Sequence, residues 1–258
     1  MVHPPIFPAG KLRDCCILGM IPVCLRKLTL ARERCRPSAM TKKRVYLVDD
    51  HPIMRQGLGQ LINHEPDMEV VGEASDAASG LTGVIESRPD LVIIDISLPG
   101  KNGLELIKDI RSHLKSAALL VHSMHDEGLY VERVLRAGAQ GYIMKQEGAR
   151  RVLDAVRKVL NGDIYVSPAM SGKILEIFSG RRPTTQDPVE ALSDRQFEIF
   201  QMIGQGKGTR AIAGDLKVSV KTVDAHRANI KDKLHLKSGT ELVRYAVRWV
   251  ENQNQKPQ

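Results

Sequence analysis

Short apolar runs alternate with longer amphipathic segments between residues 44 and 161 of this chain. The runs predict strands because they are brief, continuous and bounded by polar residues; they are Arg44–Val48, Glu69–Gly72, Leu91–Ile94, Ala118–Val121 and Gly141–Met144. Segments with helical spacing lie between and after them, and predict helices over residues 53–63, 77–87, 103–113, 127–137 and 148–161. Strands alternating with helices favour a parallel sheet, so we expect a flavodoxin-like, doubly wound α/β domain of five parallel strands.

The pattern changes after residue 161. Ser167–Phe178 predicts one more helix, and residues 179–188 are polar and proline-containing, which is typical of a tether. Residues 192–250 then predict four short helices, hence a small all-α domain.

The second and third of these helices form the informative pair. The spacing predicts helices over Thr209–Leu216 and Val220–Leu234, and Ser219 is a good N-cap for the latter. Two helices joined by a tight turn, the second carrying bases, indicate a helix-turn-helix. The expected organisation is an extension over residues 1–39, the α/β domain over 44–161, a linker over 162–187 and the helix-turn-helix domain over 188–253.

Charge separates these regions. Residues 188–258 carry twelve Lys and Arg against eight acids, whereas residues 40–187 carry nineteen against twenty. A basic second domain points to nucleic acid as its partner.

Cysteine is confined to the extension, at positions 15, 16, 24 and 35. Neither domain can therefore hold a disulfide framework, and no apolar run has the length of a membrane span, so we expect a cytoplasmic protein without a membrane partner. Met40 stands directly before the first strand, and we interpret residues 1–39 as a disordered arm or as translated upstream sequence.

The residues that carry chemistry stand at the ends of the strands. Asp49 and Asp50 follow the first strand, Asp95 the third, Ser123 the fourth and Lys145 the fifth. In a doubly wound sheet, ligands bind at that edge. Adjacent carboxylates repel one another unless a cation lies between them, and Mg²⁺ prefers carboxylate, water and phosphate oxygens. We therefore predict Mg²⁺ at Asp49, Asp50 and Asp95. Asp95 would be the nucleophile toward a phosphoryl group, Lys145 would offset its charge, and Ser123 would donate a hydrogen bond to it.

Four stretches, Val48–Pro52, Ile94–Gly103, Val121–His125 and Gly141–Lys145, resemble the receiver domain of two-component response regulators, and the NarL/FixJ family in particular. The resemblance implies that Asp95 accepts phosphate from a sensor histidine kinase. It also implies that Tyr142 is a switch aromatic, although a core ring explains this position equally well.

The second domain is similar to the LuxR-type DNA-binding domain in Leu192–Gln196, Val218–Val223 and His226–Ile230. The resemblance implies that Val220–Leu234 enters the major groove of double-stranded DNA, and that the chain forms a homodimer when phosphorylated. His226 is expected to pack or cap rather than read bases. The expected DNA-contacting residues are Thr209, Lys221, Thr222, Asp224, Ala225, Arg227, Ala228 and Lys231.

The leading hypothesis is a transcription regulator controlled by phosphorylation, and not an enzyme. One alternative is a DNA-binding or protein-interaction module that works without phosphorylation. The other is a phosphohydrolase with an aspartyl-phosphate intermediate. Such enzymes usually have an acid two residues after the nucleophile, where this chain has Ser97.

Overall fold

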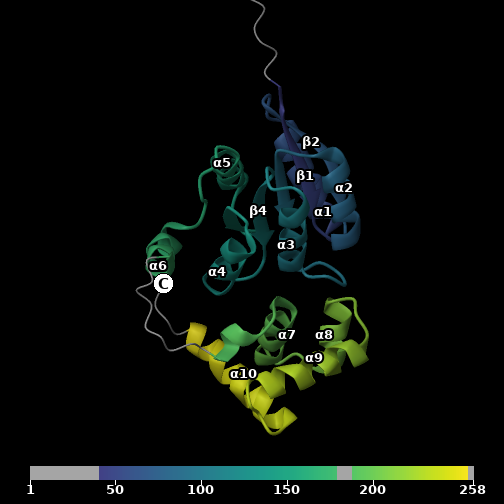
Figure 1. Ribbon diagram of the computed structural model, residues 1–258, viewed down its shortest axis with the longest axis vertical. Helices are drawn as coiled ribbons and strands as arrows, with labels where there is room; N and C mark the ends of the chain where they lie inside the picture. The colour runs from purple at the N-terminus through teal and green to yellow at the C-terminus, as the bar shows by residue number, and fades with distance from the viewer. Residues whose placement is uncertain (1–40, 179–187, 255–258) are drawn as a thin grey trace, which may run out of the picture. The chain divides into compact units, whose positions relative to one another are not determined.

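The computed structural model describes residues 41–178 and 188–254 (Figure 1). The predictions for residues 1–39 and for the tether over 179–187 fall outside these ranges. Within the described residues, none of the helices combines the length and apolar character needed to cross a bilayer.

Strands and helices alternate through the first part of the chain, which we call the α/β part (Figure 1). Its elements are β1 (Lys43–Val48), α1 (Pro52–Asn63), β2 (Met68–Ala74), α2 (Ala77–Ser87), β3 (Leu91–Ile94), α3 (Gly103–His113), β4 (Ala118–Ser123), α4 (Glu127–Ala137), β5 (Gly141–Met144) and α5 (Ala149–Leu160). All pairings are parallel and the strand order is β2-β1-β3-β4-β5. The predicted fold class is confirmed. Ser123, which we expected just beyond its strand, is the last residue of β4.

Two separate cores cover the faces of this sheet. On one face, Leu58 of α1 and Val156 of α5 pack with strand residues such as Leu47 and Ile93. On the other face, the buried side chains of α2, α3 and α4 pack with the alternate strand residues. A sheet covered on both faces explains why its strands are continuous apolar runs rather than alternating ones.

The sheet brings the carboxyl ends of its central strands into register. Val48 pairs with Ile94, and Ile94 pairs with Val121. The next residues of β1 and β3 are therefore neighbours, at the point where the strand order reverses direction. This register places Asp49 beside Asp95.

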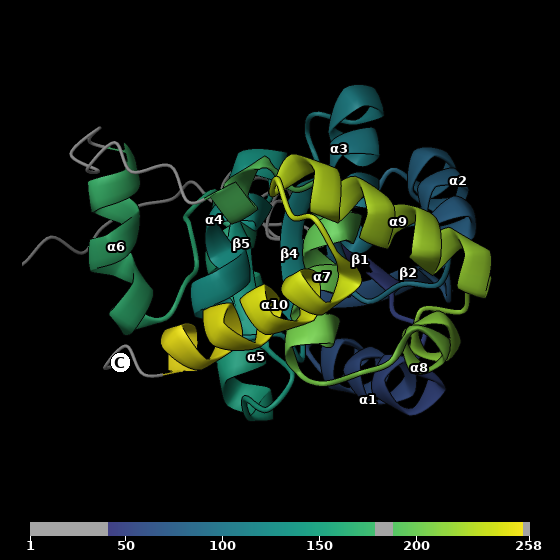
Figure 2. The ribbon, with the colours of Figure 1, turned by 90° about the horizontal axis from the view of Figure 1, so that it is seen from below.

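The second part, which we call the helical part, follows α6 (Pro168–Phe178). Its elements are a 3₁₀ turn η1 (Pro188–Ala191), α7 (Asp194–Gly204), α8 (Thr209–Asp215), α9 (Val220–Lys233) and α10 (Gly239–Asn254). The four predicted helices are all present, and η1 was not predicted. Helix α10 is longer than the helix over residues 240–249 that its apolar spacing predicts. Helix α7 begins with a capping box in which Ser193 and Gln196 bond reciprocally. It packs against both α9 and α10 (Figure 2).

An aromatic contact joins the two parts. The Phe197 ring of α7 lies 5.3 Å from the Tyr130 ring of α4 and 5.7 Å from the Trp249 ring of α10. The Arg133 guanidinium lies over Phe197, 4.2 Å from the ring centroid. Because Tyr130 and Phe197 are both buried, the apolar core of the α/β part continues into the helical part.

Candidate functional site

Lys145 joins two buried carboxylates at the carboxyl edge of the sheet. Its ammonium lies 2.7 Å from Asp49 Oδ2 and 2.7 Å from Asp95 Oδ2. The Lys145 side chain is only 2% exposed. Its backbone N–H donates to the Ser123 carbonyl, 2.8 Å away, which fixes the end of β5 beside the end of β4. The residues predicted from strands β1, β3 and β5 are thus in direct contact.

The acidic pair and its neighbours form a set of potential metal ligands. One ligand atom from each of Asp49, Asp50, His51 and Asp95 lies within 4.8 Å of the others. Asp49 Oδ1 accepts a hydrogen bond from the His51 backbone N–H at 2.8 Å. The hard carboxylate oxygens of this set suit Mg²⁺. Asp50 Oδ1 is buried and accepts no hydrogen bond within the described residues, and its polar neighbour is the ionisable His51 Nδ1 at 2.8 Å.

Burial and charge act against one another in this group. Burial raises the pKa of Asp95, Lys145 counteracts this, and the net pKa is raised above the ordinary value. Burial alone would lower the pKa of Lys145, but Asp95 and Asp49 outweigh it and the net pKa is raised. The lysine therefore stays protonated, and the site holds two buried acids against one fixed ammonium.

A second set of side chains surrounds Ser123, which is fully buried at the end of β4. Its Oγ accepts from the His125 backbone N–H at 3.3 Å. The Tyr142 hydroxyl donates to the His125 carbonyl at 2.8 Å, so this ring points inward. The His125 ring shares a 2.8 Å hydrogen bond with Ser97 Oγ. Ser123 and Tyr142 are therefore linked through one short loop.

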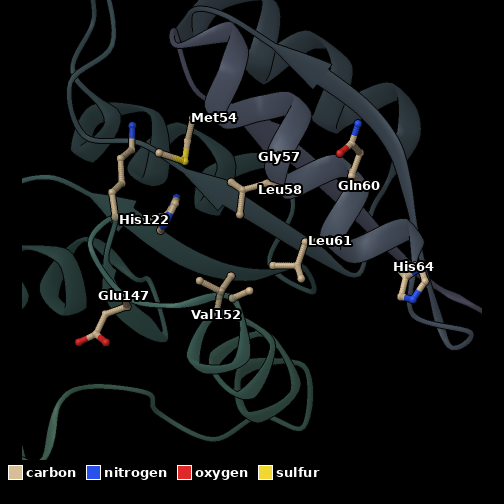
Figure 3. A pocket seen from close by; sticks show the side chains of 11 residues that line it. Met54, Gly57, Leu58, Gln60, Leu61, His64, His122, Glu147 and Val152 are labelled. Atoms are coloured by element: carbon tan, nitrogen blue, oxygen red, sulfur yellow. The ribbon is translucent and has the colours of Figure 1, made fainter.

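A cavity of about 560 Å³ opens between α1 and α5 next to this site. Figure 3 shows Met54, Leu58 and Leu61 of α1 facing Val152 of α5 across it. His122 lines it from β4, and Lys145 also contributes to its wall. Burial, followed by the charge of Lys145, lowers the pKa of His122 to about 4, so this imidazole is neutral near pH 7.

Helix α9 carries seven of the eight predicted DNA-contacting residues. Val223 and Ile230 face inward and are fully buried. Five of the predicted residues are exposed: Lys221, Thr222, Asp224, Ala225 and Ala228. Thr209, Arg227 and Lys231 are partly buried. His226, which we expected to pack or cap rather than read bases, is also partly buried.

Contacts between the two parts were not anticipated from the sequence. The Asn102 amide donates to Glu198 Oε2 at 2.8 Å, and the Lys217 ammonium lies 2.8 Å from Asp50 Oδ2. The residues of the second pair are 167 positions apart, and no local pattern marks such a pair. The Ser97–His125 bond was missed as well, although both residues belong to motifs that the sequence analysis considered.

Comparisons with known proteins agree on both parts. The model of the response regulator receiver domain matches residues 45–157, and that of the bacterial regulatory proteins of the luxR family matches residues 190–246. The oxygen regulatory protein NreC of Staphylococcus carnosus is 38% identical over 210 residues, which is 80% of this chain and 97% of that protein. Its namesake from Staphylococcus epidermidis is 37% identical over 211 residues, with the same coverage.

Solved structures show the same likeness. A two-component response regulator of the LuxR family from Aurantimonas sp. SI85-9A1 is 34% identical with a TM-score of 0.50, covering 54% of this chain and 99% of that one. RcsB from Salmonella enterica serovar Typhimurium, bound to promoter rprA in the presence of phosphomimetic BeF3⁻, is 24% identical with a TM-score of 0.53. It covers 80% of this chain and 99% of its own, and at this identity the likeness concerns the fold.

Proposed function

The chain belongs to the family of two-component response regulators that carry a LuxR-type DNA-binding domain, and from this we propose that phosphorylation controls its activity. Asp95 accepts a phosphoryl group from a sensor histidine kinase, and the helical part then regulates transcription through DNA. The observation that carries the proposal is the Lys145 ammonium held between Asp49 and Asp95 at the carboxyl edge of the sheet.

Asp95 is the proposed phosphoryl acceptor. A carboxylate oxygen of Asp95 attacks the phosphorus of a phosphohistidine on the kinase; the new O–P bond forms as the N–P bond breaks, and an acyl phosphate results. Lys145 already contacts Asp95 Oδ2, so its ammonium is in position to pair with a phosphoryl oxygen. A pre-positioned charge of this kind stabilises the negative charge of the transferring group.

Asp49, Asp50 and Asp95 are the proposed ligands of Mg²⁺. One oxygen from each of these acids lies within 4.8 Å of the others, and carboxylate oxygens are the ligands that Mg²⁺ prefers. When bound, the ion supplies positive charge against the phosphoryl oxygens. Without a cation, Asp50 adds a further negative charge beside a pair of acids that a single lysine balances only in part.

Ser123 and Tyr142 are the proposed switch residues. Ser123 Oγ would donate to a phosphoryl oxygen on Asp95, and this bond draws the end of β4 toward the site. Tyr142 is tied to the next loop through the His125 carbonyl, so a shift of that loop moves the ring with it. A ligand that stabilises one of two arrangements shifts the population toward it.

The kinase would approach the acceptor across the cavity between α1 and α5. Support comes from its apolar wall, from its opening beside Lys145 (Figure 3) and from Ile53 of α1, which is 86% exposed. A contiguous apolar surface, rather than one exposed side chain, marks a protein-binding site, and the apolar wall of the cavity supplies such a surface.

For DNA, we propose that α9 lies in the major groove and that two copies bind as a dimer. Lys221, Thr222, Arg227 and Lys231, with Thr209 of α8, would contact phosphates and so contribute affinity. Ala225 would meet a thymine methyl group, and Asp224 would accept a hydrogen bond from a cytosine amino group. Ala228 lies on the same exposed side. We propose that the protein acts in the cytoplasm, because that is where its DNA partner would lie.

The proposed activity is regulatory and not enzymatic. Position 97, where aspartyl-phosphate hydrolases have an acid, holds a serine whose hydroxyl is bonded to His125. Neither Ser97 nor the low-pKa imidazole of His125, lowered to about 4 chiefly by burial, replaces the carboxylic acid that such an enzyme needs.

The test uses acetyl phosphate with Mg²⁺ as the phosphoryl donor. The wild-type protein should gain the mass of one phosphoryl group and bind operator DNA more tightly, whereas Asp95→Asn should do neither. Asp154→Asn, an exposed acid on α5, is the matched control and should behave as wild type. Equal mass gain and equal DNA affinity in the wild type and Asp95→Asn would defeat the proposal, and tight binding by unmodified protein would favour the phosphorylation-independent alternative.

A further inference from the structure

A lysine of the helical part contacts one of the proposed metal ligands. Lys217 lies in the turn between α8 and α9, and its ammonium is 2.8 Å from Asp50 Oδ2. The other oxygen, Asp50 Oδ1, lies 2.8 Å from His51 Nδ1. The metal site and the DNA-binding helices thus share one carboxylate.

The backbone at Lys217 gives this contact a structural significance. Lys217 has a φ of 51°, in the left-handed region, and is one of three described non-glycine residues with positive φ. It is the second residue after α8, a position where glycine is common because an L side chain is disfavoured there. A lysine at such a turn carries a conformational cost, and the pair with Asp50 is a contact that glycine could not make.

The ammonium and a metal ion place opposing demands on Asp50. Mg²⁺ requires near-ideal octahedral coordination by oxygen at short distance. An ammonium in contact with Oδ2 takes a position at that oxygen which the metal ion would otherwise occupy, and its charge repels a divalent cation. Lys145 already pairs with Asp49 and Asp95. Asp50 is therefore the acid of the three with which a lysine of the helical part can pair.

We propose that Lys217 and Mg²⁺ compete for Asp50, so that metal binding and the contact between the α8–α9 turn and the site weaken one another. This inference rests on the proposed function, since it assumes the Mg²⁺ site at Asp49, Asp50 and Asp95. Coupling of two binding events is reciprocal. Metal therefore loosens one attachment of the helical part before any phosphoryl group arrives.

The size of the competition follows from exposure. The Lys217 side chain is 57% exposed and that of Asp50 is 12% exposed, so water and salt screen the pair. Exposed ion pairs are weak, and removing Lys217 should tighten Mg²⁺ binding by about two- to five-fold. Asn102 with Glu198, and Arg133 with the Leu192 carbonyl, still connect the two parts when Lys217 is replaced.

The experiment measures the Mg²⁺ dissociation constant of the full chain by isothermal titration calorimetry at constant, low ionic strength. Heat that disappears in Asp50→Asn is assigned to the site. Lys217→Met removes the ammonium and keeps most of the stem, while Lys217→Gly also suits the left-handed backbone. Lys217→Arg retains the charge. Lys237→Met is the matched charge control, because it lies beyond the far end of α9, a 14-residue helix about 20 Å long.

We expect Lys217→Met and Lys217→Gly to bind Mg²⁺ more tightly by the stated factor, and Lys217→Arg and Lys237→Met to match the wild type. The difference should shrink as salt is raised. Unchanged affinity in both Lys217→Met and Lys217→Gly, or equal tightening in Lys237→Met, would overturn the inference and leave the proposed function intact. A wild-type chain without any heat that Asp50→Asn removes would defeat the proposed metal site itself.

Discussion

Replacing Lys145 by methionine should destabilise the protein strongly, because it leaves two buried carboxylates without their shared partner. The ammonium is 2.7 Å from both Asp49 and Asp95, and all three side chains are no more than 3% exposed. Removing one partner of a buried pair costs about 3–5 kcal/mol. Protonating one carboxyl at pH 7 limits this loss to about 4 kcal/mol, since its ordinary pKa is about 3.9 and each unit corresponds to about 1.4 kcal/mol.

The stability of Lys145→Met should depend on pH for the same reason. In Lys145→Met, a carboxyl of the folded state has its pKa raised above the value in the unfolded chain, so the folded state binds more protons. Its stability therefore rises as the pH falls from that raised pKa toward about 3.9. The free-energy difference between variant and wild type should shrink by about 2 kcal/mol between pH 7 and pH 5.5.

The assay is urea unfolding followed by far-ultraviolet circular dichroism, with a chelator present, at both pH values. Lys101→Met is the control, because Lys101 pairs with Asp109 on the surface, where the two side chains are 46% and 32% exposed. Such a pair contributes about 0–1 kcal/mol. A loss below about 1 kcal/mol for Lys145→Met, or a loss that is equal at both pH values, would refute the reasoning.

Three further predictions follow from buried groups and from glycines. His122 has a pKa lowered to about 4, so the unfolded chain takes up a proton first as the pH falls below 6.5; His122→Asn should flatten the loss of stability between pH 6.5 and 4 by up to about 1.4 kcal/mol per unit, and parallel urea midpoints for both proteins would contradict this. The Tyr130 hydroxyl is buried and makes no hydrogen bond within the described residues; Tyr130→Phe should leave the free energy of unfolding unchanged or raise it by about 1 kcal/mol at most, and a clear loss in urea unfolding would contradict this. A Cβ on Gly103 would lie 2.1 Å from the Asp95 carbonyl oxygen, whereas one on Gly214 meets nothing within 4 Å; Gly103→Ala should lose about 1–3 kcal/mol and Gly214→Ala gain about 0.5–1 kcal/mol in urea unfolding, and the opposite order would be inconsistent with these spacings.

The acidic centre was predictable because its geometry follows from local patterns. Asp49 and Asp95 each directly follow a short apolar run, and a parallel sheet brings such positions to one edge. The helices over 77–87, 103–113 and 127–137 have the predicted bounds, because apolar spacing and turn residues agree there. Where local preference and tertiary structure point the same way, the sequence alone suffices.

The contacts between the two parts could not be predicted in this way. Arg195 and Glu198 are charged residues of an amphipathic helix, and the apolar spacing of such a helix predicts that its charged residues face solvent. In the structure they are only 5% and 1% exposed. Glu198 accepts from Asn102 of the α/β part and from Arg195, and the Arg195 guanidinium also donates to the Leu216 carbonyl of the helical part. Lys217 stands in a polar turn that has no pattern pointing to Asp50. Such pairs depend on how the two parts of the chain pack together, and single-sequence periodicity contains no information about that packing.

The aromatic contact at Phe197 has a practical consequence. Trp249 is the only tryptophan in the chain, and its ring lies perpendicular to that of Phe197, which also contacts the Tyr130 ring of the α/β part. Withdrawal of α7 from α4 would admit water to one side of that stack, and indole emission shifts to longer wavelength as its surroundings become wetter. The chain therefore carries an intrinsic fluorophore at the junction, and the opening of the molecule can be followed in solution without attaching a label.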